Sequence, residues 1–281
     1  MSMIELDPVS TPTVAPQLRV NLVDMRAALD VVLARARARK GFTLFTVNLD
    51  HVVKLNRSRP FRDAYARADF ITADGWPIVW LARGADRRKT PRDGSKDRRR
   101  PAALQRTTGA DLLEPMCREA AKHGLPLYFV GPGEVSQAAG LEILVGKYAG
   151  LRIVGAETPL LSSRIDEGVI DAMAARIGAV GARVCIVSLG APKQEVLADA
   201  LRKRCPDVGF LCVGAALDFI SGHAQRAPDW AQRVGMEWFW RMAGDPRRLV
   251  GRYAGCAIAL IKLSLPSIFR RSPRLQVVDG E

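Results

Sequence analysis

Several residues of this 281-residue sequence follow short apolar runs and could do chemistry there. Asp74 directly follows the run DFITA and precedes Gly75, in a turn that would expose its carboxylate. Such a carboxylate could act as a general base that takes a proton from an attacking hydroxyl, a role that contributes about 10²- to 10⁴-fold in rate. The alternative is an ordinary N-cap for a helix that begins near Pro77.

Asn48 stands in the same position after another apolar run, FTLFTV at Phe42–Val47. Its side chain could bind a polar ligand, although capping of the next helix is the favoured interpretation. Gly131, Pro132 and Gly133 also follow an apolar run and precede a helical pattern, which is the geometry in which backbone amides meet a phosphate. Because the third glycine of GxGxxG is absent, this segment does not support an NAD site.

The segment GAPKQE, at Gly190–Glu195, is less usual. Its glycine suits a turn and its proline a first helical turn, but Lys193 is unfavourable at the positive end of a helix. The segment is therefore either a solvated helix start or a contact to the edge of a nucleotide. Asp218 lies in VGAALDFISG, and a carboxylate among apolar neighbours must find partners. A turn backbone, a sugar or a base could supply them.

Other catalytic patterns are missing from the sequence. The five cysteines share no CxxC spacing, and the three histidines share no metal-ligand spacing, so no metal site is predicted. An odd number of cysteines also favours a reducing compartment. The sequence has no GxSxG elbow and no Walker A lysine, so hydrolase and kinase functions have no candidate residues.

The elements that must position these residues alternate along the chain. Strand-like runs occur at 42–47, 69–75, 125–131, 151–155, 182–190 and 207–214, and helical patterns at 24–36, 49–57, after 60, 111–123, 135–148, 166–177 and 192–204. This alternation implies right-handed crossovers and a mostly parallel sheet, which predicts a Rossmann-like α/β fold with helices on both faces. Ligands then bind beyond the carboxyl ends of the strands, where Asp74, Gly131, Gly190 and Gly214 fall.

Composition divides the chain further. With 48% hydrophobic and 25% charged residues, it is an ordinary globular unit, neither wholly disordered nor collagen-like. Residues 1–17 lack the basic and apolar stretches of a signal peptide, and we expect a disordered tail. Residues 18–225 form the expected Rossmann-like domain, interrupted at 87–101 by a basic insertion loop without an apolar residue. Residues 226–281 form a basic, aromatic-rich helical appendage.

The net charge of +13 comes from two segments. Arg87–Arg100 has eight basic against two acidic residues, and Arg226–Arg274 has ten against three, which together account for the whole excess. Such segments attract phosphates in nucleic acid, lipid head groups or small molecules. Ala254–Leu265 is an apolar run that is too short to span a bilayer. It could lie on a membrane surface or be a last core helix.

A set of motifs makes the chain similar to a known family. The motifs are TVN at 46–48, ADFITADG at 68–75, RTTGADL at 106–112, GAPKQE at 190–195, VGAALDFISG at 213–222, RAPDW at 226–230 and EWFWR at 237–241. Over about residues 18–255 the sequence closely resembles the WecG/TagA/CpsF family of glycosyltransferases. The basic insertion loop lies where the family usually has a short loop, and no function is carried over to it.

The resemblance implies an inverting, metal-independent transfer of a sugar from a UDP-sugar to a polyprenyl-diphosphate-linked saccharide, without a cofactor. Asp74 matches the family's proposed general base, and Thr46 and Asn48 match residues that line the same pocket. Gln194 and Asp218 match residues associated with the donor nucleotide. Diphosphate contacts are expected among Arg241, Arg247, Arg248 and Arg252, and further substrate contacts at Gly75, Thr108, Asp111, Gly131, Gly190, Lys193, Glu195 and Arg226.

The expected function is that of a peripheral membrane hexosyltransferase at the cytoplasmic face of the cytoplasmic membrane, in exopolysaccharide, capsule or other cell-surface polysaccharide synthesis. The appendage at 226–281 would complete the active site and bind anionic lipid. One alternative is a nucleic-acid-binding protein, suggested by the pI of about 10.1, but no helix-turn-helix, zinc finger or RNP motif is present and no nucleic acid partner is expected. Another is a UDP-binding regulator that no longer catalyses transfer.

Overall fold

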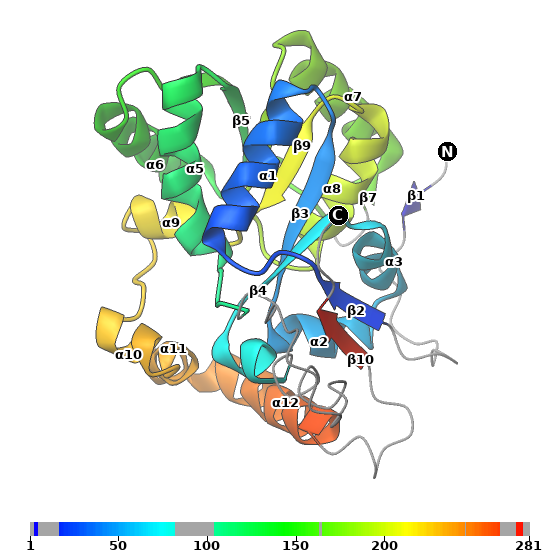
Figure 1. Ribbon diagram of the computed structural model, residues 1–281, viewed down its shortest axis with the longest axis vertical. Helices are drawn as coiled ribbons and strands as arrows, with labels where there is room; N and C mark the ends of the chain where they lie inside the picture. The colour runs from blue at the N-terminus through cyan, green and yellow to red at the C-terminus, as the bar shows by residue number, and fades with distance from the viewer. Residues whose placement is uncertain are drawn as a thin grey trace, which may run out of the picture.

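A six-stranded parallel sheet forms the centre of the computed structural model, which describes residues 3–4, 17–81, 104–162, 165–244, 246–264 and 274–277 (Figure 1). The strand order is β4-β3-β9-β8-β5-β6. The strands are β3 (Phe42–Val47), β4 (Phe70–Ala73), β5 (Pro126–Val130), β6 (Arg152–Glu157), β8 (Val184–Val187) and β9 (Gly209–Cys212). The predicted Rossmann-like, parallel α/β fold is confirmed.

Helices cover both faces of this sheet (Figure 1). One face packs against α1 (Met25–Arg37), α5 (Gly109–His123), α6 (Glu134–Lys147) and α9 (Ala216–Ile220), and the other against α2 (Leu49–Leu55), α3 (Arg59–Arg67), α7 (Glu167–Ala179) and α8 (Lys193–Arg204). In β3, Phe45 and Val47 pack into one core, and Phe42 and Leu44 into the other. Burial on both faces explains why this strand reads as a nearly continuous apolar run.

Local signals set the helix starts that matter for the site. The Asp24 carboxylate accepts a hydrogen bond of 2.8 Å from the amide of Ala27 and caps α1, as the sequence predicts. The Thr108 hydroxyl caps α5 through the amide of Asp111, at 3.0 Å. This cap starts α5 at Gly109, two residues earlier than the apolar pattern indicates, and it brings the first turn of α5 to the strand ends.

Two short pairs of strands lie outside the main sheet. β2 (Gln17–Val20) pairs in parallel with β10 (Arg274–Val277), and β1 (Met3–Ile4) pairs antiparallel with β7 (Ile165–Asp166). The expected basic insertion loop at 87–101 lies outside the described residues. Of the tail expected at 1–17, only residues 3–4 and 17 are described.

The C-terminal helices are α10 (Asp229–Arg233), α11 (Glu237–Gly244) and α12 (Pro246–Ser264). Figure 1 shows them in a row across one end of the molecule, where α12 lies beside α2. The expected apolar run from Ala254 forms the last part of α12. Cys256 is buried, whereas Ile258 and Ile261 are exposed, so this part of the helix belongs both to the core and to the surface. Within the described segments, no helix is long and apolar enough to cross a bilayer.

We expect the start of α5 to tolerate no side chain at Gly109. A Cβ there would lie 2.6 Å from the Cα and 2.7 Å from the carbonyl oxygen of Val213, which are backbone atoms and cannot swing aside. Gly109→Ala should therefore lower the free energy of unfolding by about 1–3 kcal/mol, measured by urea denaturation. Gly146→Ala in α6 is the matched control, because nothing lies within 4 Å of its Cβ. Equal losses in the two variants would contradict the packing argument.

Candidate active site

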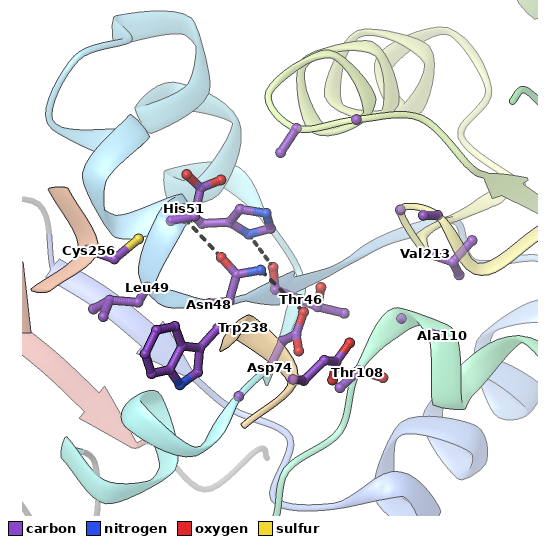
Figure 2. A pocket seen from close by; sticks show the side chains of 18 of the residues that line it. Thr46, Asn48, Leu49, His51, Asp74, Thr108, Ala110, Val213, Trp238 and Cys256 are labelled. Atoms are coloured by element: carbon purple, nitrogen blue, oxygen red, sulfur yellow. Dashed lines mark hydrogen bonds between the residues drawn. The ribbon is translucent and has the colours of Figure 1, made fainter. Parts of the chain in front are cut away.

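A pocket of about 800 Å³ opens at the carboxyl ends of four neighbouring strands. Its walls come from the segments that follow β3, β4, β8 and β9, from the first turn of α5, and from α2 and α9. Residues of all three C-terminal helices and of the turn between α10 and α11 form the remaining wall, among them Gln232, Gly235, Glu237, Trp238 and Arg252. Figure 2 shows Asn48, Asp74, Thr108 and Trp238 around this space.

Asp74 and Asn48 sit together because their strands are neighbours. Val47 pairs with Ala73 in the parallel register, so the next residue of each strand leaves the sheet at the same edge. The Asp74 amide donates to the carbonyl oxygen of Val47 at 2.8 Å, and the Asn48 Nδ2 lies 3.4 Å from the Asp74 Oδ2. Both residues line the pocket.

Asn48 is expected either to cap the next helix or to face a ligand, and its side chain can do both. Its Oδ1 accepts a hydrogen bond of 3.1 Å from the amide of His51 and caps α2, while its Nδ2 remains directed at Asp74. Asp74 behaves differently, because the next helical turn, at 76–81, bonds to the carbonyl oxygen of Gly75. Its carboxylate is thus available to the pocket.

The surroundings of Asp74 raise its pKa from the ordinary value near 4 to about 6. Burial is the largest cause, because it disfavours the charged form. The carboxylate of Glu237 raises the pKa further, while the Asn48 hydrogen bond and the positive charge of Arg106 lower it. A carboxylate with such a pKa is ionised at neutral pH and still basic enough to accept a proton in a reaction.

A buried histidine, His51, stabilises the end of β3 beside the pocket. The His51 Nδ1 lies 2.8 Å from the carbonyl oxygen of Thr46 and 2.9 Å from the Tyr65 hydroxyl, which itself donates to that carbonyl at 2.7 Å. Burial, followed by the charge of Lys54, lowers the pKa of His51 to about 4, so the ring is neutral. These bonds fix the backbone of Thr46, one of the expected pocket residues.

The GAPKQE segment divides between the pocket and the interior. Gly190 and Gln194 line the pocket, and the Gln194 Oε1 accepts a 3.0 Å hydrogen bond from the amide of Gly214. Glu195 is fully buried behind it and accepts a 2.8 Å bond from the Gln194 Nε2. Burial raises the pKa of Glu195 to about 7. Lys193 donates to the carbonyl oxygen of Leu161 at 2.6 Å and is not brought to the pocket.

An ion-pair network joins the core to the C-terminal segment. Asp111 in α5 pairs with Arg106 at 3.1 Å and with Arg226, and Arg106 lies 3.7 Å from Glu237 in α11. Arg106, Thr108 and Glu237 line the pocket, whereas Asp111 and Arg226 stand behind them. The expected residues Asp111 and Arg226 therefore position other side chains.

Of the remaining expected site residues, some line the pocket and one does not. Asp218 lines the pocket and accepts a hydrogen bond of 2.7 Å from the Ser136 hydroxyl. Gly75 lines it as well. Gly131 does not, because its amide donates to the Glu157 carbonyl oxygen at 2.8 Å and its own carbonyl oxygen accepts from Gln137 at 2.9 Å. Pro132, the next residue, does reach the pocket.

Of the four candidate arginines, Arg252 lines the pocket and bonds to the Asp50 carboxylate at 2.6 Å. Arg247 is exposed and does not line it. The side chains of Arg241 and Arg248 lie outside the described residues. Within the described segments, no group of three or more His, Cys, Asp or Glu residues is arranged to hold a metal ion.

Sequence reasoning did not assign roles to several pocket residues. Arg106 and Glu237 are the first residues of two recognised motifs, so their place in a motif is a signal that could have identified them. Asp50 and Lys54 carry no such signal, because their pocket contacts depend on residues more than a hundred positions away.

The fold and the pocket together define a class, that of parallel α/β proteins whose ligand site lies beyond the carboxyl ends of the strands, where nucleotides bind in this architecture. Residues 14–273 match the glycosyl transferase WecG/TagA/CpsF family. Because this match covers nearly the whole chain, the protein belongs to that family, and the resemblance carried by the motifs is confirmed. The family supports transferase activity and suggests a role in cell-surface polysaccharide synthesis.

Removal of the Glu237 charge should make Asp74 more acidic. Glu237→Gln takes away a negative charge that disfavours ionised Asp74, so we expect the pKa of Asp74 to fall below about 6 in a ¹³C NMR titration of its carboxyl group. Glu142→Gln, in an exposed position on α6, is the control and should leave the titration of Asp74 unchanged. An identical Asp74 pKa in Glu237→Gln would show that Glu237 has no influence on it.

Proposed function

We propose that the protein transfers a sugar from a UDP-sugar to a polyprenyl-diphosphate-linked saccharide, with inversion, at the inner face of the cytoplasmic membrane. The observation that carries this proposal is the Asp74 carboxylate, with its raised pKa, in the same pocket as the cationic side chain of Arg252. A base on one wall and a cation on another are what an inverting transfer from a diphosphate donor requires.

The chemistry follows from these two groups. The acceptor hydroxyl oxygen attacks the anomeric carbon on the face opposite the nucleotide, and its proton passes to the Asp74 carboxylate. The bond between the anomeric carbon and the diphosphate oxygen breaks, and its electron pair leaves with UDP. A single displacement of this kind inverts the anomeric centre and needs one base.

The departing diphosphate needs positive charge. Arg252 and Arg106 line the pocket and carry planar guanidinium groups, each of which can grip two phosphate oxygens. We propose that they supply the neutralising charge and that transfer proceeds without a metal ion. On the nucleotide side, Gln194 and Asp218 line the same pocket, and the Gln194 amide is held in one orientation by Gly214 and Glu195.

Membrane association is supported by the surface of the C-terminal helices. Many apolar side chains of α10–α12 and of the turn between α10 and α11 are exposed, and Arg233 and Arg247 in the same segment are exposed as well. The exposed apolar side chains of this region are Trp230, Val234, Met236, Trp238, Phe239, Trp240, Val250, Ile258 and Ile261. Apolar insertion and a contribution of about 1 kcal/mol per basic residue near anionic lipid favour reversible, peripheral binding.

Loss of the base should abolish most of the turnover. We expect Asp74→Asn to reduce acceptor-dependent UDP release by about 10²- to 10⁴-fold, with UDP affinity little changed. The assay uses a panel of UDP-sugars with short-chain polyprenyl-diphosphate sugar acceptors, in the presence of EDTA or of Mg²⁺. In the wild-type protein kcat/KM should fall as the pH drops through about 6, because the protonated form of Asp74 cannot accept a proton.

Asp63→Asn is the matched control for this experiment, because Asp63 is an aspartate of α3 outside the pocket. It should keep full activity. Full activity in folded Asp74→Asn would remove Asp74 as the base, and loss of activity in EDTA would contradict metal independence. UDP binding without turnover of any donor would favour the regulator alternative.

The exposed apolar surface should bind lipid. We expect the double variant Phe239→Ala/Ile258→Ala to bind anionic vesicles about 10-fold more weakly than the wild-type protein in sedimentation, because each side chain loses part of the roughly 1.5–3 kcal/mol of its burial. Ile143→Ala in α6 removes a comparably exposed apolar side chain far along the chain from α10–α12 and is the control. Equal binding by all three proteins would contradict a membrane contact through these helices.

A further inference from the structure

Three charged residues form a compact cluster in the pocket wall between α2 and α12. Asp50 and Lys54 belong to α2, and Arg252 belongs to α12. The Asp50 Oδ2 accepts from the Lys54 Nζ at 2.8 Å and from the Arg252 guanidinium at 2.6 Å. All three residues line the pocket.

This cluster carries a positive charge that is not balanced within it. Burial would raise the pKa of Asp50, but Lys54 and then Arg252 lower it below the ordinary value, so Asp50 is ionised at neutral pH. One negative charge thus faces two positive charges. Because the pocket is also lined by the acidic residues Asp74, Asp218 and Glu237, this cluster is the part of the wall suited to an anionic ligand.

Two of the three N–H donors of Lys54 have partners among the described residues. Its ammonium group has three N–H donors. One bonds to Asp50 and a second to the carbonyl oxygen of Ala191, at 2.9 Å. The third has no partner among the residues that the structure describes, and the side chain remains partly exposed, at 29%. Lys54 is therefore held in place and can still bind a ligand.

The contact with Ala191 places this ammonium group at the loop between β8 and α8. Gly190 and Gln194 of the same segment line the pocket, and a Cβ added at Gly190 would meet nothing within 4 Å, so the loop borders open space. Lys193, the lysine of this segment itself, is engaged with Leu161 instead. The cation beside the loop comes from α2, more than a hundred residues earlier in the chain.

We propose that Lys54 is a diphosphate-binding residue, which acts with Arg252 on the diphosphate of the donor while Asp50 holds both cations in position. The inference rests on the proposed function, because it assumes a nucleoside diphosphate in this pocket. No bond to Lys54 forms or breaks during the transfer; its charge stabilises the bound donor and the departing UDP.

Isothermal titration calorimetry of the full chain with UDP, uridine and inorganic pyrophosphate tests the role of Lys54. In Lys54→Gln we expect the affinities for UDP and pyrophosphate to fall about 10-fold or more, since one charge-assisted hydrogen bond is lost, while uridine binds as before. Lys54→Arg should recover much of the UDP affinity. Lys203→Gln is the matched control, because Lys203 forms the same i,i+4 pair, with Asp199 at 3.1 Å, on the exposed side of α8.

The outcomes separate this inference from the proposed function. In Lys54→Gln, Asp50 remains paired with Arg252, so the buried Asp50 charge keeps a partner and the variant should fold. If it does not fold, Lys54→Met, which keeps the aliphatic part of the side chain, provides the same test. Wild-type affinity for UDP in these variants, or an equal loss for UDP and uridine, would overturn the diphosphate role alone. If the wild-type protein bound neither UDP nor pyrophosphate, the proposed function would be overturned and this inference with it.

Discussion

The parallel register of β3 with β4 is the constraint on which the site depends. Val47 lies opposite Ala73, so Asn48 and Asp74 leave the sheet side by side and share a hydrogen bond. A shift of one residue would turn the side chains of a strand to the opposite faces and break both hydrophobic cores, so the same burial that stabilises the sheet also fixes this pair. The geometry of the site is thus set by the apolar residues of two strands.

Electrostatic contacts then bind the C-terminal segment, from Arg226 to α12, to that edge. Asp50 holds Arg252, and Asp111 holds Arg226, in both cases across more than a hundred residues of sequence. Arg106 approaches Glu237 in the same way. Each contact pairs a core residue with a C-terminal residue of opposite charge beside the pocket. The wall that these helices contribute is consequently sensitive to any charged ligand, because such a ligand interacts with the same groups that hold the wall in place.

Much of the fold could be predicted because its signals are local. The apolar run at Phe42–Val47 coincides with β3, and the cap at Asp24 starts α1 where the pattern indicates. Asp74, which directly follows β4, and Gly190, which lies in the loop after β8, also reach the pocket as expected. The rule that ligands bind at the carboxyl edge of a parallel sheet correctly predicts Asp74, Gly190 and Gly214 as pocket residues, but not Gly131, which lies outside the pocket lining.

The rest of the site depends on side-chain direction and distant partners, which spacing does not encode. Lys193 and Gln194 are adjacent, yet the lysine bonds to Leu161 and the glutamine faces the pocket. Lys54 falls in an ordinary helical segment, and only the fold brings it to Ala191. Asp111 and Arg226 belong to recognised motifs but stand one layer behind the pocket. A motif therefore identifies a neighbourhood more reliably than a contact.

Helix α12 has one side that lines the pocket and another that is exposed, and the helical repeat explains this division. Arg252, Cys256 and Leu260 are spaced by four residues and line the pocket along one side of the helix. At 3.6 residues per turn, Ile258 and Ile261 point away from that side, and both are exposed. Under the proposed function, the exposed side would contact lipid while the other side contacts the substrate. An acceptor saccharide on a polyprenyl diphosphate could then enter the pocket alongside α12, which lines the same pocket as Asp74, while its lipid stays in the bilayer.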